Sequence, residues 1–419
     1  MYYLPEHLGL AAPDILIPRN PSTKWSVVAC DQYTSEPEYW EQAAEFVGDE
    51  PSTLKLILPE AYLEGNTDDM IKNINDTMDN YLAQGIFRTI ESSFIYVERT
   101  LANGKVRHGL VAAVDLEKYD YNAGSTSLIR ATEGTIASRI PPRVKVRMNA
   151  PLELPHIMLL IDDPDKTVIE PLGKVKSKME KLYDFTLMKN GGNIAGWAVK
   201  EFDAISSALD GLIKRHVYNY CNKPVLLYAV GDGNHSLATA KECWERVKKT
   251  LSDEAIANHP ARYALAEIVN LHDDSLNFEP IHRVLFDVNP DEVIAELLSH
   301  YPGSYTGIGN GHVISFYSAF GEGNITVPSP ESNLTVGTLQ RFLDEYIKSH
   351  NANIDYIHGD DTVKALAEKN GGLAFILPPM KKSELFETVI LDGVLPRKTF
   401  SMGHAWDKRY YLECRKIIA

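Results

Sequence analysis

Apolar and polar positions along this chain predict a mixture of buried strands and amphipathic helices. Residues 225–230 form a short apolar run, Val-Leu-Leu-Tyr-Ala-Val, typical of a strand that is buried on both faces. Gly231-Asp232-Gly233 interrupts this run. Apolar residues then recur at three- and four-residue spacing, as on a helix with one buried face: Leu237, Ala240, Trp244 and Val247. The segment predicts a strand, a glycine turn and the start of a helix.

The same periodicities predict further elements. A helix is expected over residues 67–83, with one apolar face made of Met70, Ile71, Ile74, Met78 and Tyr81. Residues 94–100 and 105–116 are expected to form a hairpin across Asn103-Gly104, a pair typical of a type I′ turn. The apolar run at 27–30 leads into polar residues and a helix from about Pro37.

The pattern changes near residue 285, which predicts two domains in a mixed α/β fold. Residues 285–390 combine helices, a hairpin and short βα units, and we expect them to form a second, smaller α/β lobe. Residues 1–284 would form the main α/β domain. The strand-like end of segment 391–419 is expected to return to the sheet of that domain.

Composition limits the classes of function. The chain has 419 residues, a formal net charge of −15, 44% hydrophobic and 24% charged residues, which is ordinary for a soluble globular protein. Such an acidic chain is not expected to bind nucleic acid nonspecifically. Four scattered cysteines, no signal-peptide pattern and no apolar run of membrane-spanning length predict a cytoplasmic protein without a membrane partner.

Candidate chemistry concentrates at residues 231–236, Gly-Asp-Gly-Asn-His-Ser. A glycine turn before a helix presents free backbone N–H groups and a positive dipole end, which suit an anion. We expect Asn234 or Ser236 to cap this helix. Asp232 and His235 add a carboxylate and an imidazole to the turn. The alternative is a structural turn in which the aspartate satisfies backbone donors and the histidine lies on the surface.

A second candidate segment, residues 128–148, is rich in basic side chains: Arg130, Arg139, Arg143, Lys145 and Arg147. Arginine forks bind phosphate or carboxylate groups, and Glu133 lies among them as a candidate base or ion-pair partner. The alternative is a solvated basic face paired with acidic neighbours. Further candidates outside these two segments are Asp31, His272, His282, Arg283 and Lys398. Asp31 could equally cap its turn, and residues 272–283 could be a solvated loop, although His272 and His282 could also bind a metal.

The order of several short motifs resembles the bacterial domain of unknown function family 1015. These motifs are Val-Val-Ala-Cys-Asp-Gln-Tyr at 27–33, Arg-Ala-Thr-Glu-Gly-Thr at 130–135, Gly-Asp-Gly-Asn-His-Ser at 231–236, Pro-Ile-His-Arg at 280–283 and Leu-Pro-Arg-Lys-Thr at 395–399. The family's central Asp-Gly-His-His-Arg motif is similar to that of ParB/sulfiredoxin-like proteins, including free-serine kinases. The resemblance implies a mixed-sheet core of that type, with nucleotide phosphates held at the helix start.

The resemblance also implies roles for individual residues. Asp232, Gly233 and His235 match the motif, and Glu133 corresponds to an upstream glutamate that acts as the base in those kinases. Asn234 replaces a histidine and Ser236 replaces the arginine, so the phosphate charge needs another partner. Candidates for that partner, which would join Gly231 in binding phosphate, are Arg130, Arg139, Arg147 and Lys398.

Three hypotheses about function follow. The first is a phosphotransferase that uses a nucleotide such as ATP or ADP, with Mg²⁺ at Asp232, to phosphorylate a small hydroxylated metabolite such as free serine. The second is a nucleotide- or metabolite-binding regulator without catalysis. The third is a metal-dependent hydrolase that uses Asp232 and His235. The sequence contains neither a Walker Gly-Lys-Ser/Thr pattern nor a protein-kinase catalytic-loop signature.

Overall fold

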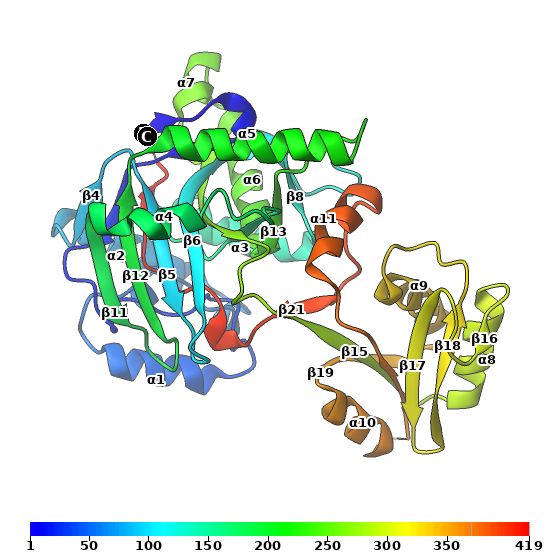
Figure 1. Ribbon diagram of the computed structural model, residues 1–419. Coiled ribbons are helices and arrows are strands. Elements are labelled where there is room, and N and C mark those ends of the chain that lie inside the picture. The colour runs from blue at the N-terminus through cyan, green and yellow to red at the C-terminus, as the bar shows by residue number, and fades with distance from the viewer. Residues whose placement is uncertain (370, 419) are drawn as a thin grey trace. The chain divides into compact units, whose positions relative to one another are not determined.

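A computed structural model describes residues 1–369 and 371–418 of the chain (Figure 1). The chain divides into two compact units, one made of Met1–Leu276 and His404–Ala419 and the other of Asn277–Gly403. Both units combine helices with sheets, which confirms the predicted mixed α/β class. The observed second unit is longer at both ends than the expected lobe of residues 285–390. The added residues include β21 and most of β15, which pair with each other.

The first unit is built on a mixed sheet of 11 strands. Nine of them run in the order β11 (Lys181–Thr186), β12 (Asn193–Val199), β5 (Phe94–Thr100), β6 (Val106–Asp115), β14 (Tyr263–Asn270), β10 (Met158–Ile161), β13 (Tyr228–Asp232), β8 (Ile129–Ala131) and β7 (Tyr119–Asp120). Beside β6 the sheet is extended by β2 (Leu10–Ala12), which in turn pairs with β1 (Tyr2–Tyr3). Two small antiparallel pairs complete the unit, β3 (Ile15–Pro18) with β4 (Phe87–Ile90) and β9 (Leu152–Glu153) with β22 (Arg415–Lys416).

Alternation along the strands gives the sheet two apolar faces. On β5, Ile95 and Val97 belong to one core cluster, whereas Phe94 and Tyr96 belong to the other. The first cluster includes residues of α1 (Pro37–Val47) and α2 (Asp68–Ala83), and the second includes residues of α5 (Phe202–Asn219) and α6 (Asn234–Lys248). The remaining α-helices of this unit are α3 (Ile140–Arg147), α4 (Glu170–Val175) and α7 (Asp253–Asn258).

Several predicted elements are confirmed, with local corrections. Helix α2 ends at Ala83 as expected and buries four of the five predicted residues, but Met70 is 40% exposed. Strands β5 and β6 form the predicted antiparallel hairpin. The predicted type I′ turn is wrong, because this turn needs a positive φ at both central residues and only Gly104, with φ of 81°, has one. The Gly104 N–H donates instead to the Leu101 carbonyl, which gives a longer loop.

The second unit contains a sheet in the order β16 (Tyr305–Thr306), β18 (Gly321–Val327), β17 (His312–Ser318), β20 (Leu373–Ile376), β15 (Phe278–Phe286) and β19 (Asn353–His358), with β21 (Phe400–Met402) also paired to β15. Its α-helices are α8 (Pro290–His300), α9 (Thr335–His350), α10 (Asp360–Lys369) and α11 (Lys382–Leu391). None of the helices in the described part of either unit has the length and apolar character needed to cross a membrane.

Candidate functional site

The strand, turn and helix predicted around residue 233 are present. β13 ends at Asp232, Gly233 adopts the left-handed conformation with φ of 81° and ψ of 30°, and α6 begins at Asn234. The Gly233 N–H donates to Asp232 Oδ1 at 3.0 Å. No side chain caps α6, so the expected capping by Asn234 or Ser236 is wrong. The first-turn N–H groups therefore remain uncapped at the positive end of the helix dipole.

Asn234 does not cap because its side chain joins the turn to β8. Its Oδ1 accepts from the Thr132 N–H at 3.3 Å, and Thr132 Oγ1 donates to the Val230 carbonyl at 2.6 Å. Glu133 is the next residue along the chain, half-buried beside this connection. Parallel pairing of β8 with β13 thus brings the segment of Glu133 to the glycine turn.

The C-terminal segment brings a lysine to the same turn. Lys408 Nζ lies 3.4 Å from Asp232 Oδ2, and the two side chains are only 15% and 17% exposed. The adjacent main chain is held near Asp31, because the Ala29 N–H donates to the Arg409 carbonyl at 2.9 Å. Burial alone raises the pKa of Asp31, but the charge of His156, a hydrogen bond from Gln32 and the charge of Lys408 together lower it below its ordinary value.

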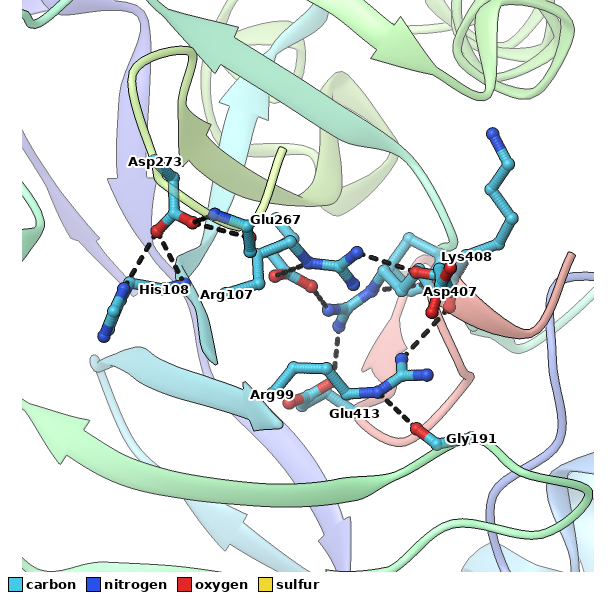
Figure 2. Close-up of polar contacts among 12 residues, drawn as sticks. Arg99, Arg107, His108, Gly191, Glu267, Asp273, Asp407, Lys408 and Glu413 are labelled. Carbon is cyan, nitrogen blue, oxygen red and sulfur yellow. Dashed lines mark hydrogen bonds and ion pairs between the residues drawn. The ribbon is translucent and has the colours of Figure 1, made fainter. Parts of the chain in front are cut away.

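Two buried arginines hold the main chain of this segment in place (Figure 2). Arg99 donates to the carbonyls of Lys408 at 3.0 Å and Trp406 at 2.8 Å, and Arg107 donates to the carbonyl of Asp407 at 2.7 Å. Figure 2 shows the Lys408 side chain extending away from both guanidinium groups. The arginines therefore fix the backbone of Lys408 while its amine remains directed to Asp232.

His235 is held as a neutral imidazole. Its Nε2 accepts a hydrogen bond from the Ile136 N–H at 3.3 Å, so this nitrogen carries no proton. Burial, together with the positive charges of Arg143 and Arg139, lowers the pKa of His235 to about 4, against a smaller opposing effect of Asp31. At neutral pH the ring is therefore a hydrogen-bonding group without a charge.

Ser236 lies beside a buried histidine. Ser236 Oγ is 3.1 Å from His156 Nε2, and His156 Nδ1 is 2.8 Å from the Tyr411 hydroxyl. Asp31 Oδ1 is 3.8 Å from the same Nε2, and the His156 side chain is 6% exposed. Ser236 and His156 line a cavity of about 150 Å³ whose other walls are largely apolar and include Leu58, Leu63, Met78 and Val146, with Arg143 and Arg147 among its polar lining.

The predicted arginines differ in their surroundings. Arg130 is 4% exposed and donates to the carbonyls of Ser127, Pro224 and Val225, which is a structural role. Arg147 donates to Glu153 at 2.5 Å, and Arg143 is paired with Glu60. Arg139 is exposed. The alternative of ion-paired basic residues thus describes Arg143 and Arg147, and their charge is largely balanced by neighbouring carboxylates.

Three further candidates belong to the second unit. His282 and Arg283 lie on β15 and are 1% and 0% exposed, so the predicted solvated loop is wrong for this segment. His282 Nε2 pairs with Asp360 at 2.8 Å, and Arg283 donates to Gln340 at 3.1 Å. Lys398 is exposed and has a positive φ of 54°. His272 belongs to the first unit, where it pairs with Asp162 at 2.7 Å.

The side chains near the turn that could hold a metal ion are carboxylates. Within residues 1–369 and 371–418, no three or more His, Cys, Asp or Glu side chains are grouped to hold a metal ion. Asp232 and Asp31 both lie in the field of Lys408. Two carboxylates suit Mg²⁺, because this ion usually takes one or two protein carboxylates and completes its shell with water and substrate phosphate.

The family of the chain follows from comparison with known proteins. The sequence profile of the family described as "Protein of unknown function (DUF1015)" matches residues 15–368. The chain belongs to the DUF1015 family. This confirms the family expected from the order of the motifs. Among curated proteins, none matches this DUF1015 chain.

Solved structures similar to this DUF1015 protein have low identity. A free serine kinase in complex with AMP has a TM-score of 0.37 and 12% identity, covering 75% of this chain and 92% of that chain. A conserved hypothetical protein from Pyrococcus furiosus has a TM-score of 0.34 and 14% identity, covering 74% and 92%. SbnI with a C-terminal truncation, from Staphylococcus aureus, has a TM-score of 0.36 and 10% identity, covering 70% and 83%.

Sequence reasoning missed three residues near this candidate site: His156, Lys408 and Tyr411. His156 precedes β10, and antiparallel pairing of β10 with β13 places it beside the turn. A histidine at the start of an apolar strand was a detectable signal, as was the Lys408-Arg409 pair before an apolar end. Neither signal indicated a partner, because each partner is distant in sequence.

Proposed function

We propose that this protein binds the phosphate groups of a nucleotide at the start of α6 and transfers a phosphoryl group to a small hydroxylated molecule. The observation that carries the proposal is the position of Lys408, whose amine lies 3.4 Å from Asp232 at an uncapped helix N-terminus. Helix N–H groups and a fixed cation stabilise phosphate charge, which is the main task in phosphoryl transfer. Lys408 would thus supply the charge that Ser236 cannot.

The other residues take complementary roles in this proposal. Asp232 and Asp31 would hold a phosphate-bound Mg²⁺, which supplies further charge neutralisation. Neutral His235 would donate a hydrogen bond through Nδ1, since Nε2 accepts from Ile136. Glu133, in the segment joined to the turn through Thr132 and Asn234, would accept the proton of the attacking hydroxyl.

Thermal denaturation with ATP, ADP, CTP and free amino acids, each with and without Mg²⁺, tests the binding step. A ligand present at 100 times its dissociation constant stabilises the folded state by about 2.7 kcal/mol, so one Mg²⁺-nucleotide should raise the melting temperature. Lys408→Ala should weaken its binding about 10- to 100-fold, the size of a lost charged hydrogen bond. No shift with any nucleotide at millimolar concentration would contradict the proposal.

Lys398→Ala is the matched variant, because Lys398 is an exposed lysine that the sequence predicted to bind phosphate. A loss of binding in Lys398→Ala but not in Lys408→Ala would assign the phosphate charge to Lys398 instead. Glu133→Gln separates catalysis from binding. It should keep the nucleotide-dependent shift and lose phosphoryl transfer, whereas a regulator without catalysis would show no transfer in either protein.

A further inference from the structure

The contact between Ser236 and His156 has the geometry of a nucleophile and its base, and the phosphate proposal does not use it. Ser236 Oγ lies 3.1 Å from His156 Nε2, within the range at which a histidine takes the proton of a serine hydroxyl. His156 is buried, so packing limits its rotation. The contact joins the first turn of α6 to the residue pair that precedes β10.

His156 can act as the base for Ser236 in the tautomer that carries its proton on Nδ1. The Tyr411 hydroxyl oxygen accepts from the Cys30 N–H at 3.2 Å, and the hydroxyl also contacts the Cys30 side chain, where its own proton can be directed. His156 Nδ1–H can then donate to the same oxygen at 2.8 Å. Nε2 is left as the acceptor for Ser236, and Asp31, 3.8 Å away, stabilises the imidazolium that forms.

Donors and space for a substrate are present at the same position. Ser236 lies in the first turn of α6, whose N–H groups have no side-chain cap and can stabilise a developing oxyanion. The cavity of about 150 Å³ opens beside Ser236 and His156, and its walls are mostly apolar, with Leu58, Leu63 and Met78 among them. The charged residues of its lining form two ion pairs, Arg143 with Glu60 and Arg147 with Glu153. Such walls suit an apolar acyl group rather than a charged one.

We propose that Ser236 is a catalytic nucleophile, with His156 as its base, that hydrolyses carboxylic esters carrying a short apolar acyl group. Ser236 Oγ attacks the carbonyl carbon while its proton passes to His156 Nε2. The bond between the carbonyl carbon and the alcohol oxygen breaks, and the departing alcohol takes the proton from His156. Water, deprotonated by His156, then attacks the acyl-serine and releases the carboxylic acid and Ser236.

An alkyl fluorophosphonate tests this activity without a nucleotide, since it phosphonylates activated serines with loss of fluoride. The expected result is modification of Ser236, located by peptide mass mapping, and hydrolysis of p-nitrophenyl butyrate. Both should disappear in Ser236→Ala and persist in Ser138→Ala, which changes an exposed serine. His156→Gln should slow labelling about 100-fold or more, the usual contribution of a general base.

Tyr411→Phe keeps the buried ring and removes only the hydroxyl, so it remains informative where His156→Gln does not fold. Tyr411→Phe should slow the labelling of Ser236, and its thermal unfolding should show that the variant is folded. The proposal is overturned when Ser236 in the folded wild-type protein is unlabelled or is labelled no faster than Ser138. It is also overturned when folded His156→Gln and Tyr411→Phe both label at the wild-type rate.

The two proposals fail separately. A nucleotide bound at the start of α6 occupies the N–H groups that Ser236 chemistry needs, so Mg²⁺-nucleotide should protect Ser236 from the fluorophosphonate. Labelling of Ser236 without a nucleotide-dependent thermal shift would support the ester activity and contradict the phosphotransferase. A nucleotide-dependent shift without labelling would do the opposite.

Discussion

His235 shows how neighbouring charges set the properties of one side chain. Its ring accepts a backbone hydrogen bond and lies in the positive field of Arg143 and Arg139. From the sequence, the same residue was equally consistent with a surface histidine. Its neutral form depends first on burial and then on the charge of Arg143, which lies on α3, far from residue 235 in sequence.

The lowered pKa of His235 predicts the direction of its effect on stability. Because the folded-state pKa of about 4 lies below the ordinary 6.5, protonation favours the unfolded chain. The stability that neutral His235 contributes is complete above pH 6.5 and is lost as the pH falls from 6.5 toward 4. An NMR titration, with His235→Gln to assign the resonance, should show this ring titrating near 4. Titration near 6.5 would contradict the neutral, enclosed ring.

At the scale of elements, the turn between β13 and α6 depends on Gly233. Its φ of 81° is left-handed, and an added Cβ would lie 3.1 Å from the Cα of Ile157. Both the conformation and the contact with main chain on the neighbouring segment disfavour a side chain. Residues 156 and 157 can therefore approach the turn closely only because residue 233 has no Cβ.

Gly233→Ala should destabilise the first unit by at least about 1–2 kcal/mol, the cost of a left-handed residue with a side chain. Gly211→Ala is the control, because Gly211 lies inside α5 with no atom within 4 Å of the added Cβ. Gly211→Ala should stabilise the first unit by up to about 1 kcal/mol, because alanine favours the helical conformation more than glycine does. Urea unfolding followed by tryptophan fluorescence measures the free energy of unfolding of both variants. Equal changes in the two would show that the turn does not require glycine at position 233.

At the scale of the whole molecule, the C-terminal segment completes the first unit. Arg409, 2% exposed, pairs with Glu267 on β14 and with Glu413 at 2.5 Å. The Trp25 indole donates to the Leu412 carbonyl at 3.0 Å. Of the segment 391–419 that was expected to return to the sheet, only the part from His404 belongs to this unit. It pairs through β9 and single bridges to Leu16 and Val28 rather than with the central sheet.

Arg409→Met should destabilise the first unit by about 3–5 kcal/mol, because it removes the nearest cation of two buried carboxylates, Glu267 and Glu413. All five tryptophans of the chain lie in this unit, so fluorescence-detected unfolding reports on it alone. Lys72→Ala, which removes an exposed pair with Asp76, should leave the unfolding midpoint unchanged. Similar midpoints for both variants would show that the buried network contributes little.

The sequence by itself determined the local elements of this protein and the position of its central turn. Apolar periodicity depends only on neighbouring residues, so strand β13, helix α6 and the β5–β6 hairpin were readable directly, although β13 continues through Gly231 to Asp232. The glycines and polar residues of 231–236 indicated an anion site for the same local reason.

Only the tertiary structure decided which distant side chains meet at that turn. Lys408 reaches Asp232 because Arg99 and Arg107 hold its backbone, and His156 reaches Ser236 because β10 pairs with β13. It also assigned Arg130 to backbone carbonyls and Arg147 to Glu153. Residue type shows which charge a side chain carries, whereas strand order and burial decide which partner that charge faces.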